Sequence, residues 1–98
     1  MGGLVEFEWD PTKADKNRRK HGVTFGEAVT VFYDPLEITF EDPDRDLEER
    51  RYITLGMSSK NRILLVIHCD RDDRIRIVSA RIAKRREVKG YEEGIFQD

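Results

Sequence analysis

The chain has 98 residues and a mass of 11.5 kDa, which allows one compact domain spanning residues 1–98. Hydrophobic residues make up 38% and charged residues 39%, so a small core must carry a highly charged surface. Apolar runs are far shorter than the roughly 18 residues of a membrane helix, and neither a signal peptide nor a myristoylation motif is visible. The single cysteine excludes an internal disulfide and a cysteine-based zinc cluster. We therefore expect a cytoplasmic protein.

The formal net charge of −2 conceals three strongly charged blocks. Residues 12–21 carry a net charge of +4, residues 41–49 carry −5, and residues 74–89 carry +6. Basic blocks of this kind can bind phosphates even when the whole protein is acidic. The alternative is that they are solvated helix faces.

The N-terminal part of the chain is predicted to form one strand and two helices. Alternating residues over 4–9 predict a half-buried strand. Asp10 and Pro11 provide an N-cap and a first-turn proline for a helix that runs to His21 and ends at Gly22. Residues 24–27 fit a capping box for a second helix, which packs on the core and ends at residues 34–35.

The rest of the chain is predicted to be mainly strands. We expect strands over 36–40, 50–57, 63–68 and 74–78, with a polar loop over 41–49 and turns at 58–61 and 70–73. A last helix is predicted to open at Ser79 or Ala80 and to run to Tyr91, followed by a loose tail over 94–98. This order of strand, helix, helix, four strands and helix favours an α+β fold with a mostly antiparallel sheet.

The two early helices are predicted to cover one face of this sheet. The other face is predicted to be polar and basic, and to carry Arg50, Tyr52, Thr54, Arg74 and Arg76. A basic sheet face with a few aromatic residues is typical of nucleic-acid binding.

Several chemistries are excluded by the absence of their motifs. Asp42, Asp44 and Asp46 occupy three positions of a calcium loop, but Leu47 and Ile53 stand where glycine and glutamate are required. The chain has no H-E-x-x-H, no P-loop, no glycine-rich dinucleotide turn and no G-x-S-x-G. What remains is cleavage of RNA without a metal or cofactor, in which the ribose 2′-OH attacks its own phosphate.

Individual side chains have both a structural and a functional interpretation. His21 at a helix C-terminus could transfer a proton or could interact with the helix dipole, and His68 is interpreted as a structural histidine. Trp9 is interpreted as a core residue, with base stacking as the alternative. Arg76 either pairs with a carboxylate or faces a ligand. Arg81 at the predicted helix start opposes the helix dipole, which indicates phosphate binding or an acidic partner.

A series of short stretches is specific in its order and spacing. The stretches are 7–10, Asn17, 20–23, 25–28, 31–32, 34–35, 49–52, Gly56 and 74–81, followed by Glu87 and Tyr91. With these the chain resembles, over residues 5–92, the BrnT family of ribonuclease toxins from type II toxin–antitoxin systems. The resemblance implies a RelE-like fold, metal-independent cleavage of RNA, growth arrest by the free toxin and neutralisation by a BrnA-like antitoxin.

The resemblance also implies partners and site residues. The toxin–antitoxin complex is expected to bind its own promoter through the antitoxin, and the toxin is expected to dimerise within it. The candidate catalytic residues are Lys20, His21, Glu49, Arg50, Arg76 and Arg81. The candidate RNA-binding residues are Trp9, Tyr52, Arg74, Ser79, Arg85 and Tyr91. The preferred roles are proton transfer by His21 or Glu49, phosphate contact by Arg50 and Arg76, and backbone contact by Lys20.

Two other functions are compatible with the sequence. One is a non-catalytic module of the same fold that binds nucleic acid or an antitoxin. The other is a DNA-binding regulator, because the helices that end at Gly22 and begin at Thr24 mimic a helix-turn-helix. The second of these helices is apolar where a recognition helix should be polar, which disfavours the regulator.

Overall fold

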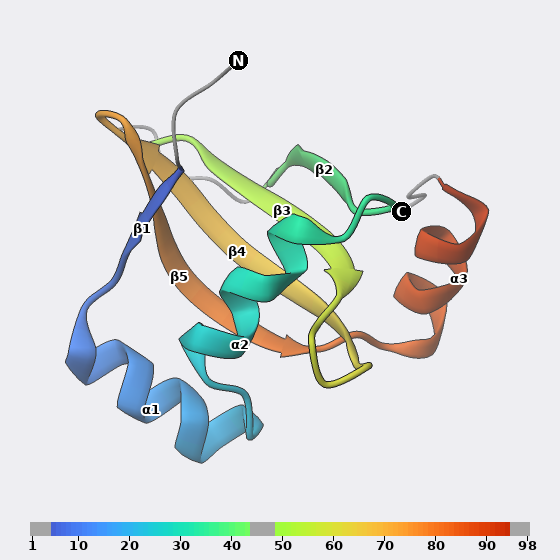
Figure 1. The fold of residues 1–98 in the computed structure, drawn as a ribbon, viewed down its shortest axis with the longest axis horizontal. Coiled ribbons are helices and arrows are strands. Elements are labelled where there is room, and N and C mark those ends of the chain that lie inside the picture. The colour runs from blue at the N-terminus through green and yellow to red at the C-terminus, as the bar shows by residue number, and fades with distance from the viewer. Residues whose placement is uncertain (1–4, 44–48, 95–98) are drawn as a thin grey trace.

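In the computed structural model, the described part of the chain folds into a mixed five-stranded sheet and three α-helices (Figure 1). The structure describes residues 5–43 and 49–94, so the predicted tail at 95–98 and the middle of the predicted acidic loop, 44–48, lie outside the described residues. The elements are β1 (Glu6–Glu8), α1 (Pro11–His21), α2 (Phe25–Thr30), a 3₁₀ turn η1 (Val31–Tyr33), β2 (Ile38–Glu41), β3 (Arg51–Met57), β4 (Ile63–Arg71), β5 (Arg74–Ile82) and α3 (Arg85–Glu93).

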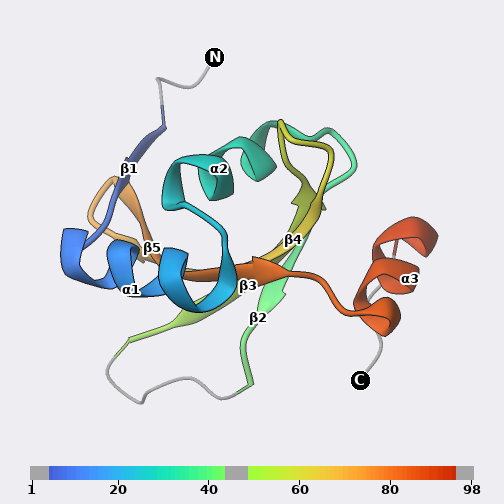
Figure 2. The same ribbon diagram turned by 90° about the horizontal axis from the view of Figure 1, so that it is seen from below.

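The strands lie in the order β1-β5-β4-β3-β2. β1 runs parallel to β5, and the other three pairs are antiparallel. The α+β class predicted from the sequence is thereby confirmed. Figure 2 shows α2 on one side of the sheet and α3 beyond the end of β5. No helix of the described part of the chain is long and apolar enough to cross a membrane.

α1 begins and ends, and α2 begins, where their capping residues predict. α2 itself ends at Thr30 rather than at the predicted residues 34–35, and the 3₁₀ turn η1 fills most of the difference. The Asp10 carboxylate accepts a hydrogen bond of 2.8 Å from the Thr12 N–H, and α1 ends at Gly22 with φ +70°. The Thr24 hydroxyl accepts a hydrogen bond of 3.0 Å from the Glu27 N–H at the start of α2. The Glu27 carboxylate, however, is buried and binds Ser58 and Arg62 of the β3–β4 hairpin. Of the predicted capping box, the structure therefore contains the Thr24 hydrogen bond, whereas the Glu27 side chain binds the β3–β4 hairpin.

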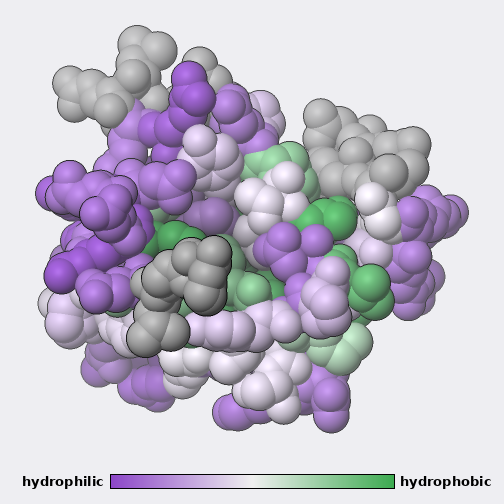
Figure 3. Space-filling view, turned by 45° about the horizontal axis from the view of Figure 1, so that its top comes forward, coloured by the Kyte–Doolittle hydropathy of each residue, from purple (hydrophilic) through white to green (hydrophobic). Residues whose placement is uncertain are grey.

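The main core lies between the early helices and the sheet. Val23, Phe25, Ala28 and Val31 pack against buried residues of β4 and β5, which are Leu64, Val66, Ile77 and Ala80. This confirms that α1 and α2 cover one sheet face. The surface in Figure 3 is mostly hydrophilic with separate hydrophobic patches, as expected for a small core in a highly charged chain.

β3 passes so close to η1 that only glycine fits at position 56. A Cβ atom on Gly56 would lie 2.7 Å from Val31 Cγ1 and 3.1 Å from the Val31 carbonyl oxygen. We expect Gly56→Ala to lower the free energy of unfolding by about 2 kcal/mol, because the buried Val31 cannot move away without cost. Urea denaturation measures this loss. Gly26→Ala is the control, since its Cβ would meet only Thr24 Oγ1 at 3.9 Å; equal stability of the two variants would contradict the expectation.

The prediction for the last strand and helix is wrong at their junction. β5 continues to Ile82, and α3 begins only at Arg85. The register of β4 and β5 shifts between Ile67 and His68, which leaves Val78 as the extra residue of a β-bulge. Because the bulge interrupts the alternation of the strand, residues 78–80 look like the start of a helix. Arg81 therefore lies in a strand, and the predicted conflict with a helix dipole does not arise.

The assignment of sheet faces is also wrong for β3. Tyr52 and Thr54 pair with His68 and Val66, which lie on the face covered by α1 and α2. Thr54 is fully buried there. Arg74 and Arg76 lie on the opposite face. That face is not uniformly polar, because Leu55 and Leu65 pack on it with Tyr91 of α3. Both faces of β3 are therefore buried, and alternation alone could not show which one meets the helices.

Candidate functional site

A row of polar side chains crosses four strands on the sheet face that α1 and α2 leave uncovered. Arg51 of β3 is paired with Cys69 of β4, Cys69 with Arg76 of β5, and Arg76 with Glu8 of β1. Ile77 and Ile75, the neighbours of Arg76 in β5, belong to the core under the helices. Since side chains alternate along a strand, the four residues share the other face. We call these residues, together with Glu49 just before β3, the charged row.

The β1 side of the charged row is held by ion pairs. Arg76 Nη1 lies 3.0 Å from Glu8 Oε2, and both side chains are about three-quarters buried. Arg74 contacts Glu6 at 3.0 Å and Glu8 at 3.5 Å. The hydrogen bond from Arg76 lowers the pKa of Glu8. Glu8 therefore remains ionised and fixes the guanidinium of Arg76 on the sheet.

The β3 side of the charged row combines a carboxylate with a second arginine. The pKa of the fully buried Cys69 thiol is raised, first by burial and then by the adjacent Glu49, whose carboxylate accepts its hydrogen bond. Arg76 and Arg51 both act on this thiol electrostatically, which places them beside it. Arg51 Nε is buried and has no hydrogen-bond partner in the described part of the chain. The row thus holds an unsatisfied donor next to a carboxylate.

Two further candidate site residues of β5, Ser79 and Arg81, lie on the same sheet face as the charged row. Ser79 is paired with Ile67 and Arg81 with Leu65, so both lie beyond the charged row. Arg81 forms two hydrogen bonds of 2.9 and 2.8 Å to the Glu87 carboxylate at the start of α3. Burial alone would raise the pKa of Glu87, but Arg81 and the Lys84 N–H hold it below its ordinary value. Arg81 therefore anchors α3 to β5.

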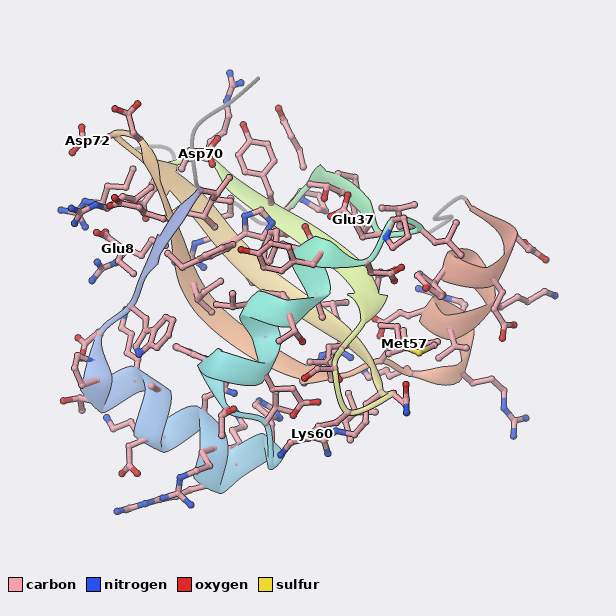
Figure 4. The ribbon with its side chains drawn as sticks, viewed as in Figure 1. Glu8, Glu37, Met57, Lys60, Asp70 and Asp72 are labelled. Carbon is pink, nitrogen blue, oxygen red and sulfur yellow. The ribbon has the colours of Figure 1, made fainter. Side chains whose placement is uncertain are left out.

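Lys20 and His21 are not brought together with the charged row. They lie in the last turn of α1, and the neighbouring Gly22 carbonyl accepts a hydrogen bond of 3.2 Å from Arg62 of the β3–β4 hairpin. The charged row lies toward the β4–β5 hairpin instead. Figure 4 shows the two hairpins, marked by Lys60 and Asp72, at opposite ends of the sheet. The seven residues of β3 alone span about 20 Å between these ends.

The other candidates are scattered over the molecule. Trp9 packs edge-on against Phe25 with ring centroids 6.0 Å apart, and Tyr52 stacks on His68 at 5.9 Å. Arg50 is exposed and lies 3.6 Å from Glu41, and Arg85 is exposed at the start of α3. Only Glu49, Arg74 and Arg76 of the twelve candidates gather at the charged row.

Tyr91 has a structural environment of its own. Its hydroxyl donates a hydrogen bond of 2.6 Å to Asp34 Oδ2, which ties α3 to the segment after η1. Burial and the Asp34 carboxylate together raise the pKa of Tyr91 to about 12. The pair lines an apolar groove of about 610 Å³ with Tyr33, Leu36 and Met57. Tyr91 is therefore a neutral donor that positions α3.

Sequence reasoning missed three members of the charged row, Glu8, Arg51 and Cys69. Alternation along β3 placed Arg50 on the functional face, whereas in the structure Arg51 joins the charged row and Arg50 is exposed just before the strand. Glu8 and Arg51 do belong to the stretches 7–10 and 49–52 that carry the family resemblance. Membership of these stretches is the sequence signal that could have identified Glu8 and Arg51 as site residues. Cys69 is a buried neighbour of Glu49, which nothing in its local sequence indicates.

The mixed sheet and the charged row, which holds two arginines and two carboxylates on the face opposite α1 and α2, define a small α+β protein with a charged site on its sheet. The profile of the family described as "Ribonuclease toxin, BrnT, of type II toxin-antitoxin system" matches residues 9–87. The chain therefore belongs to the BrnT family of ribonuclease toxins, whose type II systems pair a toxin with an antitoxin.

The fold is similar to that of a solved member of this family. The crystal structure of the Brucella abortus ribonuclease toxin BrnT aligns with a TM-score of 0.62 at 20% sequence identity, over 84% of this chain and 100% of that chain. No curated protein matches the sequence. The structural likeness supports the β1-to-α3 arrangement described above.

Proposed function

We propose that the protein is a RelE-like endoribonuclease that cleaves RNA at the charged row without a metal or cofactor. The observation that supports this most is the placement of Glu49, Arg51 and Arg76 around Cys69, on the sheet face opposite α1 and α2. A carboxylate can take a proton from a ribose 2′-OH, and guanidinium groups stabilise the charge that develops on the phosphate. Among the described residues, no three His, Cys, Asp or Glu side chains gather as metal ligands.

In the proposed reaction Glu49 accepts the proton of the 2′-OH. The 2′ oxygen then attacks the adjacent phosphorus, and the bond from phosphorus to the 5′ oxygen breaks. The leaving 5′ oxygen takes a proton from water, and the products are a 2′,3′-cyclic phosphate and a 5′-hydroxyl. Arg51 and Arg76 stabilise the negative charge that develops on the phosphate oxygens in the transition state. Lys20 and His21 lie too far from this row to act in the chemical step.

Replacing Arg76 tests this proposal. We expect Arg76→Ala to reduce cleavage of a labelled RNA in EDTA at least about 100-fold, because the charge on the phosphorane loses a fixed partner. RNA binding should be largely retained. Arg86→Ala, at an exposed position of α3, is the matched control and should cleave like the parent.

Full activity of Arg76→Ala would contradict the assignment of the charged row. Intact RNA with the parent protein, both alone and with ribosomes, would instead favour the non-catalytic binding module. DNA of the same sequence should stay intact in either case, because it lacks the attacking 2′-OH.

We further propose that a BrnA-like antitoxin neutralises the protein by covering the charged face. Arg74 and Arg76 would pair there with an acidic segment of the antitoxin. The complex, containing a toxin dimer, would then bind its own operator through the antitoxin and repress it in the cytoplasm. Co-purification with the antitoxin, followed by its loss in an Arg74→Glu/Arg76→Glu variant, tests the contact.

A further inference from the structure

α1 carries three lysines on one flank that neither the core nor the charged row uses. Lys13, Lys16 and Lys20 are exposed, and none of them forms an ion pair within residues 5–43 and 49–94. In contrast, Arg18 and Arg19 of the same helix both bind Asp15, at 2.9 and 3.0 Å. At 3.6 residues per turn, the three lysines fall within about 60° of one another around the helix axis. We call them the lysine ridge.

The stability of α1 explains only Lys20 of the lysine ridge, because this residue lies in the last turn, where a positive charge favours the helix dipole. Lysines three and four residues apart repel one another on a helix surface. Lys13 also lies in the first turn, which holds no acidic residue, so its charge opposes the helix dipole. The helix is fixed by its caps and by the buried Asn17 instead. A bound polyanion would relieve the repulsion that the free protein retains.

The lysine ridge faces away from α2. Ala14, Asp15 and Arg18 line a hollow of about 220 Å³ together with residues 24–26 at the start of α2. The lysines lie on the opposite flank of the helix, next to the side on which Asn17 reaches Ala80 of β5. In Figures 1 and 2 α1 lies beside the end of β5, along the edge of the sheet. The ridge therefore borders the sheet face that carries the charged row.

We propose that the lysine ridge binds the phosphate backbone of single-stranded RNA outside the nucleotides that are cleaved. α1 begins three residues after Glu8 of the charged row, and its eleven residues span about 16 Å. A strand that leaves the charged row over the β1 edge therefore meets the ridge. The choice of RNA rests on the proposed function, whereas the affinity for phosphates rests on the lysines alone.

The test measures binding rather than cleavage. A fluorescein-labelled 2′-O-methyl RNA, which has no attacking 2′-OH, is titrated with the parent protein and with Lys13→Gln/Lys16→Gln/Lys20→Gln. We expect the affinity of the variant to fall about tenfold at 0.1 M KCl. The slope of log K against log [KCl] should become shallower by about 2, as expected when three phosphate contacts to a single strand are lost.

The matched control removes three charges elsewhere. Lys60→Gln/Arg86→Gln/Lys89→Gln changes exposed residues of the β3–β4 turn and α3, and it should retain the parent slope. An equal loss in both variants would show a general charge effect and overturn the proposal. The thermal midpoint of the ridge variant should match or exceed that of the parent, because repulsion is relieved. If the ridge variant instead keeps its RNA affinity but loses the antitoxin, the ridge is a protein-binding surface.

A second pair of substrates separates the ridge from the cleavage site. We expect Lys13→Gln/Lys16→Gln, which leaves Lys20 in place, to cleave a dinucleotide at the parent rate, and a 30-nucleotide RNA with a raised KM and an unchanged kcat. If neither the parent nor any variant cleaves RNA, but the ridge variant still has a shallower salt slope than the parent, the proposed ribonuclease reaction is wrong. The proposal that the lysine ridge binds RNA phosphates is then still supported. A lowered kcat on the dinucleotide would place the lysines in the cleavage site and overturn the ridge.

Discussion

Replacing Asn17 with alanine is expected to lower the free energy of unfolding by about 3 kcal/mol. The Asn17 side chain is 7% exposed and joins three segments of the chain. Its amide donates to the carbonyl oxygens of Val23 at 3.0 Å and Ala80 at 2.8 Å, and its oxygen accepts from the Ala80 N–H at 3.1 Å. Alanine would leave three backbone groups without partners in a buried place, and each such group costs about 1–3 kcal/mol.

Urea denaturation of the Asn17 variants measures this effect. Lys16→Ala, one position earlier on the exposed side of α1, is the control and should change stability by less than about 0.5 kcal/mol. Asn17→Asp keeps an acceptor but loses both N–H donors and buries a charge, so it should be at least as damaging as alanine. An alanine variant as stable as the control would show that water or a shift of α1 replaces the three hydrogen bonds.

The helix boundaries near the N-terminus could be predicted because their signals are local. Asp10, Pro11 and Gly22 act within a few residues of the ends of α1, and Thr24 does so for α2. The junction of β5 and α3 could not, because the bulge at Val78 depends on how β5 pairs with β4. Asn17 shows the same limit. Nothing in the local sequence shows that Asn17 is buried, because its partners Val23 and Ala80 are 6 and 63 residues away.

The candidate site was predictable in composition but not in geometry. Glu49 and Arg76 were singled out from the sequence, and both lie beside Cys69 because β3 and β5 both pair with β4. Which flank of β3 faces them depends on η1, which packs over Gly56 on the other face. That contact turns Tyr52 inward and Arg51 outward. A pattern of alternation gives two faces without saying which one is covered.

The stability of the protein is expected to fall between about pH 6.5 and pH 4 because of His68. Its ring is 4% exposed and lies edge-on to Phe32 at 4.9 Å. Burial lowers its pKa to about 4, although Asp70 acts in the opposite direction. Between these pH values His68 binds a proton in the unfolded chain but not in the folded protein, so acidification favours unfolding. The full difference corresponds to about 3 kcal/mol, present above pH 6.5 and lost by pH 4.

The hydrogen-bond chain around His68 explains why the ring stays neutral. The Glu37 carboxylate can only accept, so Thr39 donates to it, Thr54 donates to Thr39, and His68 Nε2–H donates to Thr54. The proton of the neutral ring is therefore on Nε2. Nδ1 is buried without a partner in the described part of the chain, so a second proton there would have no acceptor.

His68→Gln separates this effect from the other titrating groups. Its amide can still donate to Thr54, but it carries no proton that titrates. The carboxylates of Glu8, Glu27 and Glu87, whose pKa values are lowered, destabilise both proteins alike as the pH falls. The difference in unfolding free energy between parent and variant should therefore shift by about 2–3 kcal/mol in favour of the variant from pH 7.5 to pH 4.5. A difference that stays constant over this range would mean that the His68 ring is protonated in the folded protein, with Nδ1 bonded to a group that must then accept.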